Sequence, residues 1–234
     1  MDKDLSLQEG IFLSVFFVLL LWTIKLGESL LGVSLSSLGV FPQQTSGLFG
    51  IVAAPLIHGS WQHVISNTLP IILLGSMLLY GYPKSRWWVL LIVWLASGVG
   101  VWLFARSSSH IGASGITHGI FFFLFTAGIL RRDKRSSVLL MVAFFMYGTM
   151  IWTIFPQEPG ISFEYHFCGA VSGVVCAVLF SHRDPKPLIK TYDWEATPTD
   201  HEPDEYDLVI GDQWKLDSPP SEPAAGTYIP AERH

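Results

Sequence analysis

The sequence predicts an all-α polytopic membrane protein with six membrane-spanning helices and a disordered acidic C-terminal tail. Half of the 234 residues are hydrophobic and only 14% are charged, whereas an ordinary soluble domain has about a quarter of its residues charged. Apolar runs close to the roughly 20 residues that cross a bilayer recur ahead of the tail. Residues 1–182 hold 9 basic and 7 acidic residues, and residues 183–234 hold 5 basic and 12 acidic ones. This pattern excludes a single water-soluble domain and argues against nucleic acid as a partner.

The apolar runs define six spans and a membrane domain over residues 11–182. The predicted spans are 11–26, 61–80, 87–105, 113–130, 137–155 and 162–181. The first is the shortest, because Lys25 interrupts its uncharged run, but a lysine near a helix end can extend its side chain to the interface. No small-residue cleavage site follows Lys25, so we interpret residues 1–10 as a cytoplasmic N-terminus and the first span as a retained anchor.

Basic residues in the short connections predict how the spans are oriented. They gather between spans two and three, between four and five, and after six, as Lys84, Arg86, Arg131, Arg132, Lys134, Arg135, Arg183, Lys186 and Lys190. We therefore expect an integral protein of the plasma or inner membrane with both termini in the cytoplasm. Spans two, four and six then begin at the outer face.

The tail over residues 183–234 has the composition of a disordered segment. Residues 184–234 contain eight prolines and a dense scatter of acidic residues, with little apolar content to bury. Such a segment cannot offset the entropy cost of folding. We expect it to be solvated on the cytoplasmic side.

Three clusters of polar and small residues open the outward ends of spans two, four and six. Polar groups are costly inside a bilayer, so clusters of this kind mark candidate functional sites. They read HGSWQHVISN at 58–67, GASGITHG at 112–119 and YHFCGAVSG at 165–173. Ser114 lies 17 residues before Arg131, about 25 Å at helical rise, and therefore several Å below the outer face. His166 lies at a similar depth, so the serine and the histidine can meet.

Small residues on spans four and six would let these two helices approach closely. Gly115 and Gly119 form one G-x-x-x-G face, and Gly169 and Gly173 form another. This spacing permits near contact between helix backbones. Helix packing without catalysis is the alternative meaning of the spacing when it is taken alone.

Together the three clusters resemble the signature of the rhomboid intramembrane serine proteases. That signature places G-x-S-G at the start of the fourth core helix, a histidine followed by small residues on the sixth, and H-x-x-x-N on the second. The matching residues here are Gly112, Ser114 and Gly115, then His166, Gly169 and Gly173, then His63 and Asn67. The likeness covers residues 48–180. It departs in the first loop, where residues 27–56 lack the Trp-Arg pair often found in the family.

The resemblance implies an enzyme that cuts membrane-anchored proteins within or beside a transmembrane segment. Ser114 would be the nucleophile and His166 the general base, acting as a dyad. No third member is expected, because no acidic residue lies in the apolar core and Glu164 falls on a different helix face from His166. Backbone N–H groups at the helix start near Ser114, with Asn67 and His63, would stabilise the oxyanion.

Other functions compete with this interpretation. A rhomboid-like protein that binds membrane clients without cutting them would share the fold, but we would expect it to lack the serine or the histidine. A transporter or channel would more often show an internal repeat and ionisable residues near the bilayer midplane. A soluble hydrolase with G-x-S-x-G is excluded, because residue 116 is isoleucine.

Several of these residues also have an alternative role when each is considered alone. Ser114 alone would be interpreted as a helix N-cap, and His118 is a rival base because it lies one turn further along the same face. Hydrogen bonding between helices is the alternative role of His63 and Asn67. We interpret His58 and His110 as interfacial or loop histidines, with a position bordering the site as the alternative for His58. We expect no cofactor and no metal, because the sequence has no His/Cys cluster at ligand spacing. Substrate identity and oligomeric state are not specified by the sequence.

Overall fold

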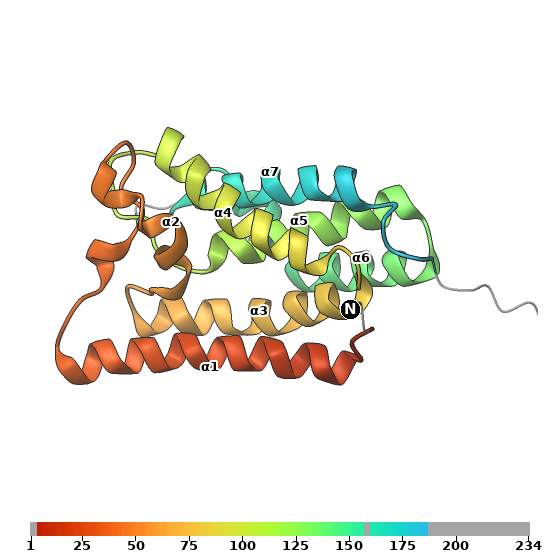
Figure 1. Ribbon diagram of the computed structural model, residues 1–234, viewed down its shortest axis with the longest axis horizontal. Helices are drawn as coiled ribbons and strands as arrows, with labels where there is room; N and C mark the ends of the chain where they lie inside the picture. Colours follow the sequence, from red (N-terminus) through yellow and green to blue (C-terminus); the bar gives the residue numbers. More distant parts are fainter. Residues whose placement is uncertain (1–3, 157–159, 187–234) are drawn as a thin grey trace, which may run out of the picture. The chain divides into compact units, whose positions relative to one another are not determined.

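The computed structural model describes residues 4–156 and 160–186, and this part of the chain is helical (Figure 1). The long helices are α1 (Leu7–Leu31), α3 (Trp61–Gly81), α4 (Arg86–Phe104), α5 (Ser114–Arg131), α6 (Lys134–Tyr147) and α7 (Phe163–Phe180). The connection from α1 to α3 holds the short helices η1 (Ser36–Leu38), η2 (Thr45–Gly47), α2 (Gly50–Ala53) and η3 (Ala54–Leu56), and η4 (Gly148–Ile154) follows α6. Within the described residues there is no strand, only an isolated β-bridge. The predicted all-α class is confirmed.

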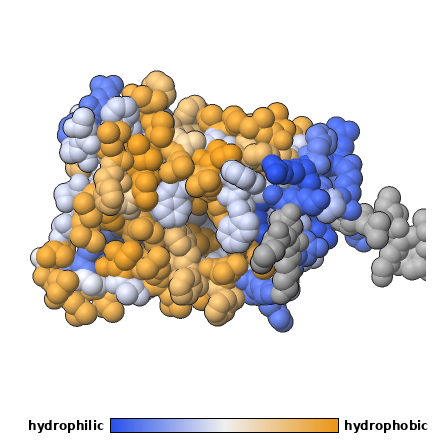
Figure 2. All heavy atoms as spheres, in the orientation of Figure 1, coloured by the Kyte–Doolittle hydropathy of each residue, from blue (hydrophilic) through white to orange (hydrophobic). Residues whose placement is uncertain are grey.

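Within residues 4–156 and 160–186, six helices are long and apolar enough to cross a membrane, as predicted, if α6 and η4 are counted together. Apolar side chains cover much of the bundle flank in Figure 2, and polar ones gather at the end where α7 finishes. Phe12, Phe104 and Phe145 are 70%, 82% and 77% exposed. Exposed apolar area on this scale is unfavourable in water but not in lipid, and helices satisfy their own backbone hydrogen bonds. The chain is therefore an integral membrane protein.

Helix α1 begins four residues before the predicted first span and ends five residues after it. A capping box starts it: the Ser6 side chain accepts from the backbone N–H of Glu9, and the Glu9 side chain accepts from the backbone N–H of Ser6. Lys25 does not end the helix, because its ammonium is paired with Glu28 at 3.2 Å. Gly32 ends it in the left-handed conformation, with φ of +64°.

The predicted fifth span is two elements rather than one continuous helix. The α-helix ends at Tyr147, and the chain tightens into the 3₁₀ winding of η4 as far as Ile154. A 3₁₀ segment of this length is uncommon, because its hydrogen-bond geometry is poorer than that of an α-helix. The winding fixes where Thr153 lies, which matters for the site described below.

Helix α5 is the most enclosed of the spanning helices. Of its most apolar stretch, 67% is buried inside the bundle, against 17% for α6 with η4 and 22% for α1. Side chains such as Phe121, Phe123 and Leu124 form the main apolar core with residues of α3, α4, α6 and α7. The helix that carries Ser114 is therefore held by its neighbours on most sides.

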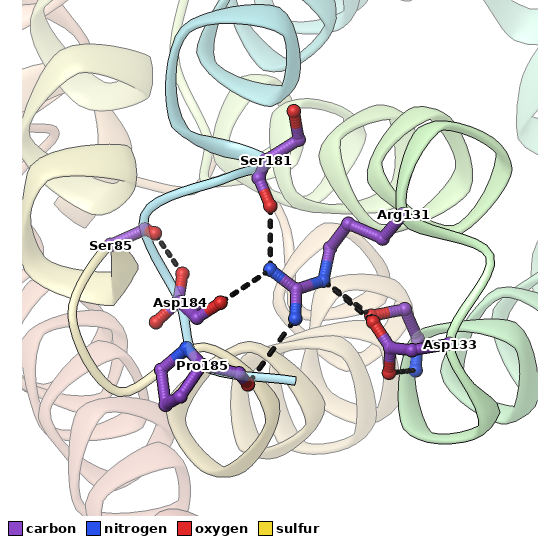
Figure 3. A network of polar contacts seen from close by, with 7 residues as sticks. Ser85, Arg131, Asp133, Ser181, Asp184 and Pro185 are labelled. Carbon is purple, nitrogen blue, oxygen red and sulfur yellow. Dashed lines mark hydrogen bonds and ion pairs between the residues drawn. The ribbon is translucent and has the colours of Figure 1, made fainter. Parts of the chain in front are cut away.

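A polar network joins three chain segments at the opposite end of α5 from Ser114 (Figure 3). Its centre is Arg131, which is only 4% exposed. The guanidinium pairs with Asp133 at 2.9 Å and donates to Ser136, and it also donates to the carbonyl oxygens of Ser181, Asp184 and Pro185. We call this set of residues the Arg131 clasp: Ser85, Arg131, Asp133, Ser136, Ser181, Asp184 and Pro185. It ties the end of α5 to the end of α7.

Asp184 extends the clasp to the connection between α3 and α4. Its carboxylate accepts from the backbone N–H of Lys84 at 2.6 Å and from the Ser85 hydroxyl, and the residue is 3% exposed. The sequence analysis assigned residues 183–234 to the tail, but Asp184 and Pro185 contact the bundle because they supply these acceptors. Residues 187–234, where the rest of the predicted disordered tail falls, lie outside the described residues.

We expect Asp184→Ala to lower the stability of the bundle by about 1–3 kcal/mol, because it leaves the Lys84 N–H and the Ser85 hydroxyl without their acceptor. The measurement is the thermal midpoint in detergent. His182→Ala is the matched control, since His182 is exposed in the same short segment. Equal midpoints for the two variants would contradict a stabilising clasp.

Candidate active site

Helices α5 and α7 approach each other closely at their glycines, on both predicted G-x-x-x-G faces. A Cβ atom at Gly169 would overlap the carbonyl oxygen of Gly115, and one at Gly173 would overlap that of Gly119. Because the obstructing atoms belong to the backbone, no side chain can move aside to make room. This contact brings the start of α5, with Ser114, beside the start of α7, with His166.

We expect Gly169→Ala to force α5 and α7 apart and to lower both the thermal midpoint and the activity. Overpacking of this kind typically costs about 1–3 kcal/mol. Gly27→Ala is the control: Gly27 lies inside α1, and a Cβ there would meet no atom within 4 Å. A Gly169→Ala protein as stable as Gly27→Ala would show that the two helices tolerate a wider spacing.

Ser114 occupies the first position of α5 and is partly exposed. Ala113, not Ser114, is the N-cap residue, and no side chain caps this helix start. In the described part of the chain, the Ser114 hydroxyl makes no hydrogen bond, and neither do the backbone N–H groups of Ser114 and Gly115. The hydroxyl and two donors at the positive end of the helix dipole are therefore available to a ligand.

The loop before Ser114 is held by the preceding connection between α1 and α3. Gly112 donates to the carbonyl of Ala54 at 2.9 Å, and the N–H of Ala113 donates to Nε2 of His58 at 3.4 Å. His58 is 1% exposed, and burial, with smaller effects from neighbouring His63 and Lys25, lowers its pKa to about 3. The ring therefore stays neutral at physiological pH and keeps the lone pair that accepts from Ala113.

Helix α3 places His63 against the serine loop and Asn67 one turn deeper. A Cβ at Gly112 would lie 2.5 Å from Cε1 of His63, and Gly112 has φ of +108°, so glycine is required there on both grounds. His63 is partly exposed, whereas Asn67 is 4% exposed. The Asn67 amide donates one hydrogen to the carbonyl of His63 at 3.0 Å. This bond lies within α3, and in the described part of the chain the Asn67 side chain makes no hydrogen bond to another helix.

His118 lies between Ser114 and His166 and contacts both. Its Nδ1 lies 2.7 Å from the carbonyl oxygen of Ser114, and its ring stacks on that of His166 with centroids 3.9 Å apart and planes 9° apart. Its Nε2 lies 2.7 Å from the hydroxyl of Thr153 in η4. Both ring nitrogens thus have hydrogen-bond partners other than the Ser114 hydroxyl.

His166 is 8% exposed and is held by η4 as well as by His118. Its Nδ1 lies 3.0 Å from the carbonyl oxygen of Thr153. A carbonyl can only accept, so Nδ1 carries the proton and Nε2 of the neutral ring has the lone pair. Within the described residues Nε2 has no hydrogen-bond partner, and Ser114 and His166 are not directly bonded to each other.

Two residues next to His166 in the sequence have other roles. Glu164 pairs with Arg106 at 3.4 Å and does not contact His166. Tyr165 is fully buried with Val40 and Val101, and its ring borders Gly115. His110 ties the loop between α4 and α5 to α7, because its Nδ1 lies 2.6 Å from the hydroxyl of Ser162, the α7 N-cap. These contacts fix the starts of α5 and α7 relative to each other.

The structure adds His58, His118 and Thr153 to the residues that surround the predicted site. The sequence analysis interpreted His58 as an interfacial or loop histidine, with a bordering position as the alternative, and gave His118 only the role of a rival base. Thr153 had no sequence signal, because its carbonyl oxygen is a group that every residue carries. The structure shows that the predicted fifth span changes to 3₁₀ winding at Gly148, which brings Thr153 to the site.

Comparisons with known proteins bear on the part of the chain that holds the candidate site. A family model described as Rhomboid domain matches residues 45–183. An uncharacterized protein of Mycobacterium bovis is 36% identical over 179 residues, which cover 73% of this chain and 75% of that protein. An uncharacterized protein of Mycobacterium tuberculosis gives the same values. One of Mycobacterium leprae is 34% identical over 179 residues, which cover 73% of this chain and 71% of that protein.

Proposed function

Because this chain belongs to the rhomboid family, we propose that it is an intramembrane serine protease with Ser114 as nucleophile and His166 as general base. The observation that carries the proposal is the placement of His118, whose Nδ1 contacts the Ser114 carbonyl and whose ring stacks on His166. These contacts support a serine and a histidine that act at one point. They also engage both ring nitrogens of His118, the one histidine of α5.

The chemistry follows from the two free atoms. The Ser114 oxygen attacks the carbonyl carbon of the scissile peptide while its proton passes to Nε2 of His166. The imidazolium then returns that proton to the leaving amine, and the C–N bond breaks to give an acyl-enzyme. A water molecule, deprotonated by the same nitrogen, releases the new carboxyl end. No cofactor takes part in these steps.

Three groups on two helices are suited to stabilise the oxyanion of the tetrahedral intermediate. The backbone N–H of Ser114 is unpaired within the described residues. The Asn67 amide has a second hydrogen beyond the one given to the His63 carbonyl. The imidazole of His63 lies against the serine loop. Preorganised donors of this kind usually supply the largest single contribution to catalysis in serine hydrolases.

The substrate class we propose is a membrane-anchored protein cut within or beside its transmembrane segment. The site lies at the starts of α3, α5 and α7, and the basic connections lie at their other ends. By the positive-inside rule the site then opens toward the outer face of the plasma or inner membrane, with both termini cytoplasmic. Ser114 is shallow and partly exposed, so water can reach it.

The test is incubation of the detergent-purified full chain with a generic transmembrane substrate, beside its Ser114→Ala form. Cleavage by the first protein only, together with fluorophosphonate labelling that Ser114→Ala removes, is the expected result. Binding of the substrate without cleavage by either protein would instead identify a rhomboid-like binding factor.

A further inference from the structure

Among the described residues His166 has no acidic hydrogen-bond partner, yet its ring is held by contacts on two sides. In a Ser-His-Asp triad the aspartate accepts from Nδ1 of the histidine and fixes both its tautomer and its orientation. Here Glu164 is paired with Arg106 instead. The acceptor at Nδ1 of His166 is the carbonyl oxygen of Thr153, at 3.0 Å and 13 residues earlier in the chain.

The same residue makes a second contact that fixes where its carbonyl oxygen points. The Thr153 hydroxyl lies 2.7 Å from Nε2 of His118. His118 Nδ1 must donate to the Ser114 carbonyl, because that oxygen can only accept. Nε2 of the neutral ring is therefore an acceptor. The Thr153 hydroxyl also lies 3.0 Å from the carbonyl oxygen of Met150, so it shares its single hydrogen between His118 and Met150. The contacts from Ser114 through His118 and Thr153 to His166 fit two neutral rings that are both protonated on Nδ1.

We propose that Thr153 and His118 are positioning residues that hold His166 in the Nδ1–H tautomer, with Nε2 directed to the nucleophile. The Thr153 carbonyl supplies the acceptor that an aspartate supplies in a triad. The hydroxyl of Thr153 fastens η4 to α5, so that this carbonyl stays in place, and the His118 ring supports the flat face of His166. This inference rests on the proposed function, because it assigns a task within that site.

The first test compares substitutions at two threonines of η4. Thr153→Val keeps the shape and the backbone carbonyl but removes the hydroxyl, with its contacts to His118 and to the Met150 carbonyl within η4. We expect kcat to fall about tenfold or more with KM unchanged, and Thr153→Ser to recover most of the loss. Thr149→Val is the matched control, because Thr149 is exposed in the same element and its hydroxyl makes no hydrogen bond within the described residues. Equal kcat for the Thr153→Val and Thr149→Val proteins would overturn the role of Thr153.

A second variant decides the case in which Thr153→Val does not fold. His118→Phe keeps a flat ring against His166 but loses the bonds to Ser114 and Thr153. We expect it to lower kcat without a matching change in KM, by an amount similar to Thr153→Val. Full activity in a folded His118→Phe protein would contradict the proposal, because stacking alone would then be enough.

The tautomer can be measured directly, without any substrate. In the wild-type protein labelled with ¹⁵N-histidine, we expect the His166 resonances, assigned by their loss in His166→Ala, to report a protonated Nδ1. A dominant Nε2–H tautomer would overturn the inference even if the enzyme is active. If neither the wild-type nor the Ser114→Ala protein cleaves substrate, the proposed function fails, and the spectrum still reports whether Thr153 holds the ring.

Discussion

Replacing either Ser114 or His166 by alanine is expected to reduce proteolysis below about a hundredth of the wild-type rate and to leave the fold intact. The two residues act in the same proton transfer, so removing one already disables the other. Their effects should therefore not add, and the double variant should be no slower than either single variant. Substrate cleavage and the thermal midpoint should be measured on all three proteins.

Two further proteins make this result specific. Ser108→Ala removes an exposed hydroxyl from the loop between α4 and α5, just before Ser114, and should cleave like the wild type. His118→Ala should be milder than His166→Ala, because His118 positions the base and does not itself transfer the proton. A Ser114→Ala protein that retains more than about a hundredth of the activity would remove Ser114 and His166 from their roles.

Asn67→Ala is expected to lower kcat with little change in KM, because an oxyanion donor strengthens its bond only as charge develops in the transition state. Loss of one such side-chain donor costs about 10²–10³-fold in other serine hydrolases, about 2.7–4 kcal/mol. If His63 and the Ser114 N–H also stabilise the oxyanion, the expected loss in kcat is smaller, about tenfold or 1.4 kcal/mol. Steady-state kinetics at several substrate concentrations separates kcat from KM.

The structure offers a close control for Asn67. The hydroxyl of Ser66 donates to the same His63 carbonyl at 2.9 Å, but from an exposed position on α3. Ser66→Ala removes a similar local bond without removing a donor from the buried side. If Asn67→Ala only weakened the helix, both variants would lower the thermal midpoint alike and leave kcat unchanged. That result would remove Asn67 from the oxyanion site.

The six spans were predictable because a helix that crosses lipid must be apolar over a nearly fixed length. The approach of α5 and α7 was also foreseeable, because Gly115 and Gly169 stand at a spacing that favours backbone contact. Three features had no comparable signal. Thr153 acts through its backbone, the 3₁₀ winding of η4 differs from an α-helix by a small change in dihedral angles, and Arg131 was interpreted only as a marker of orientation. Each depends on which segments meet in space, which composition and periodicity do not specify.

The Arg131 clasp also determines the order in which the bundle can be completed during biosynthesis. Arg131 leaves the ribosome 50 residues before Ser181, whose carbonyl accepts from it in the finished protein. A nascent chain that has reached only α6 holds a guanidinium whose later acceptors have not yet been synthesised. Asp133 and Ser136 are present by then, but the guanidinium hydrogens that later bind the carbonyls near the end of α7 are still unpaired, and burying them in that state is unfavourable. We therefore expect the end of α5 to stay open to water or lipid headgroups until the last helix inserts, so that closure of this end of the bundle comes late in translation.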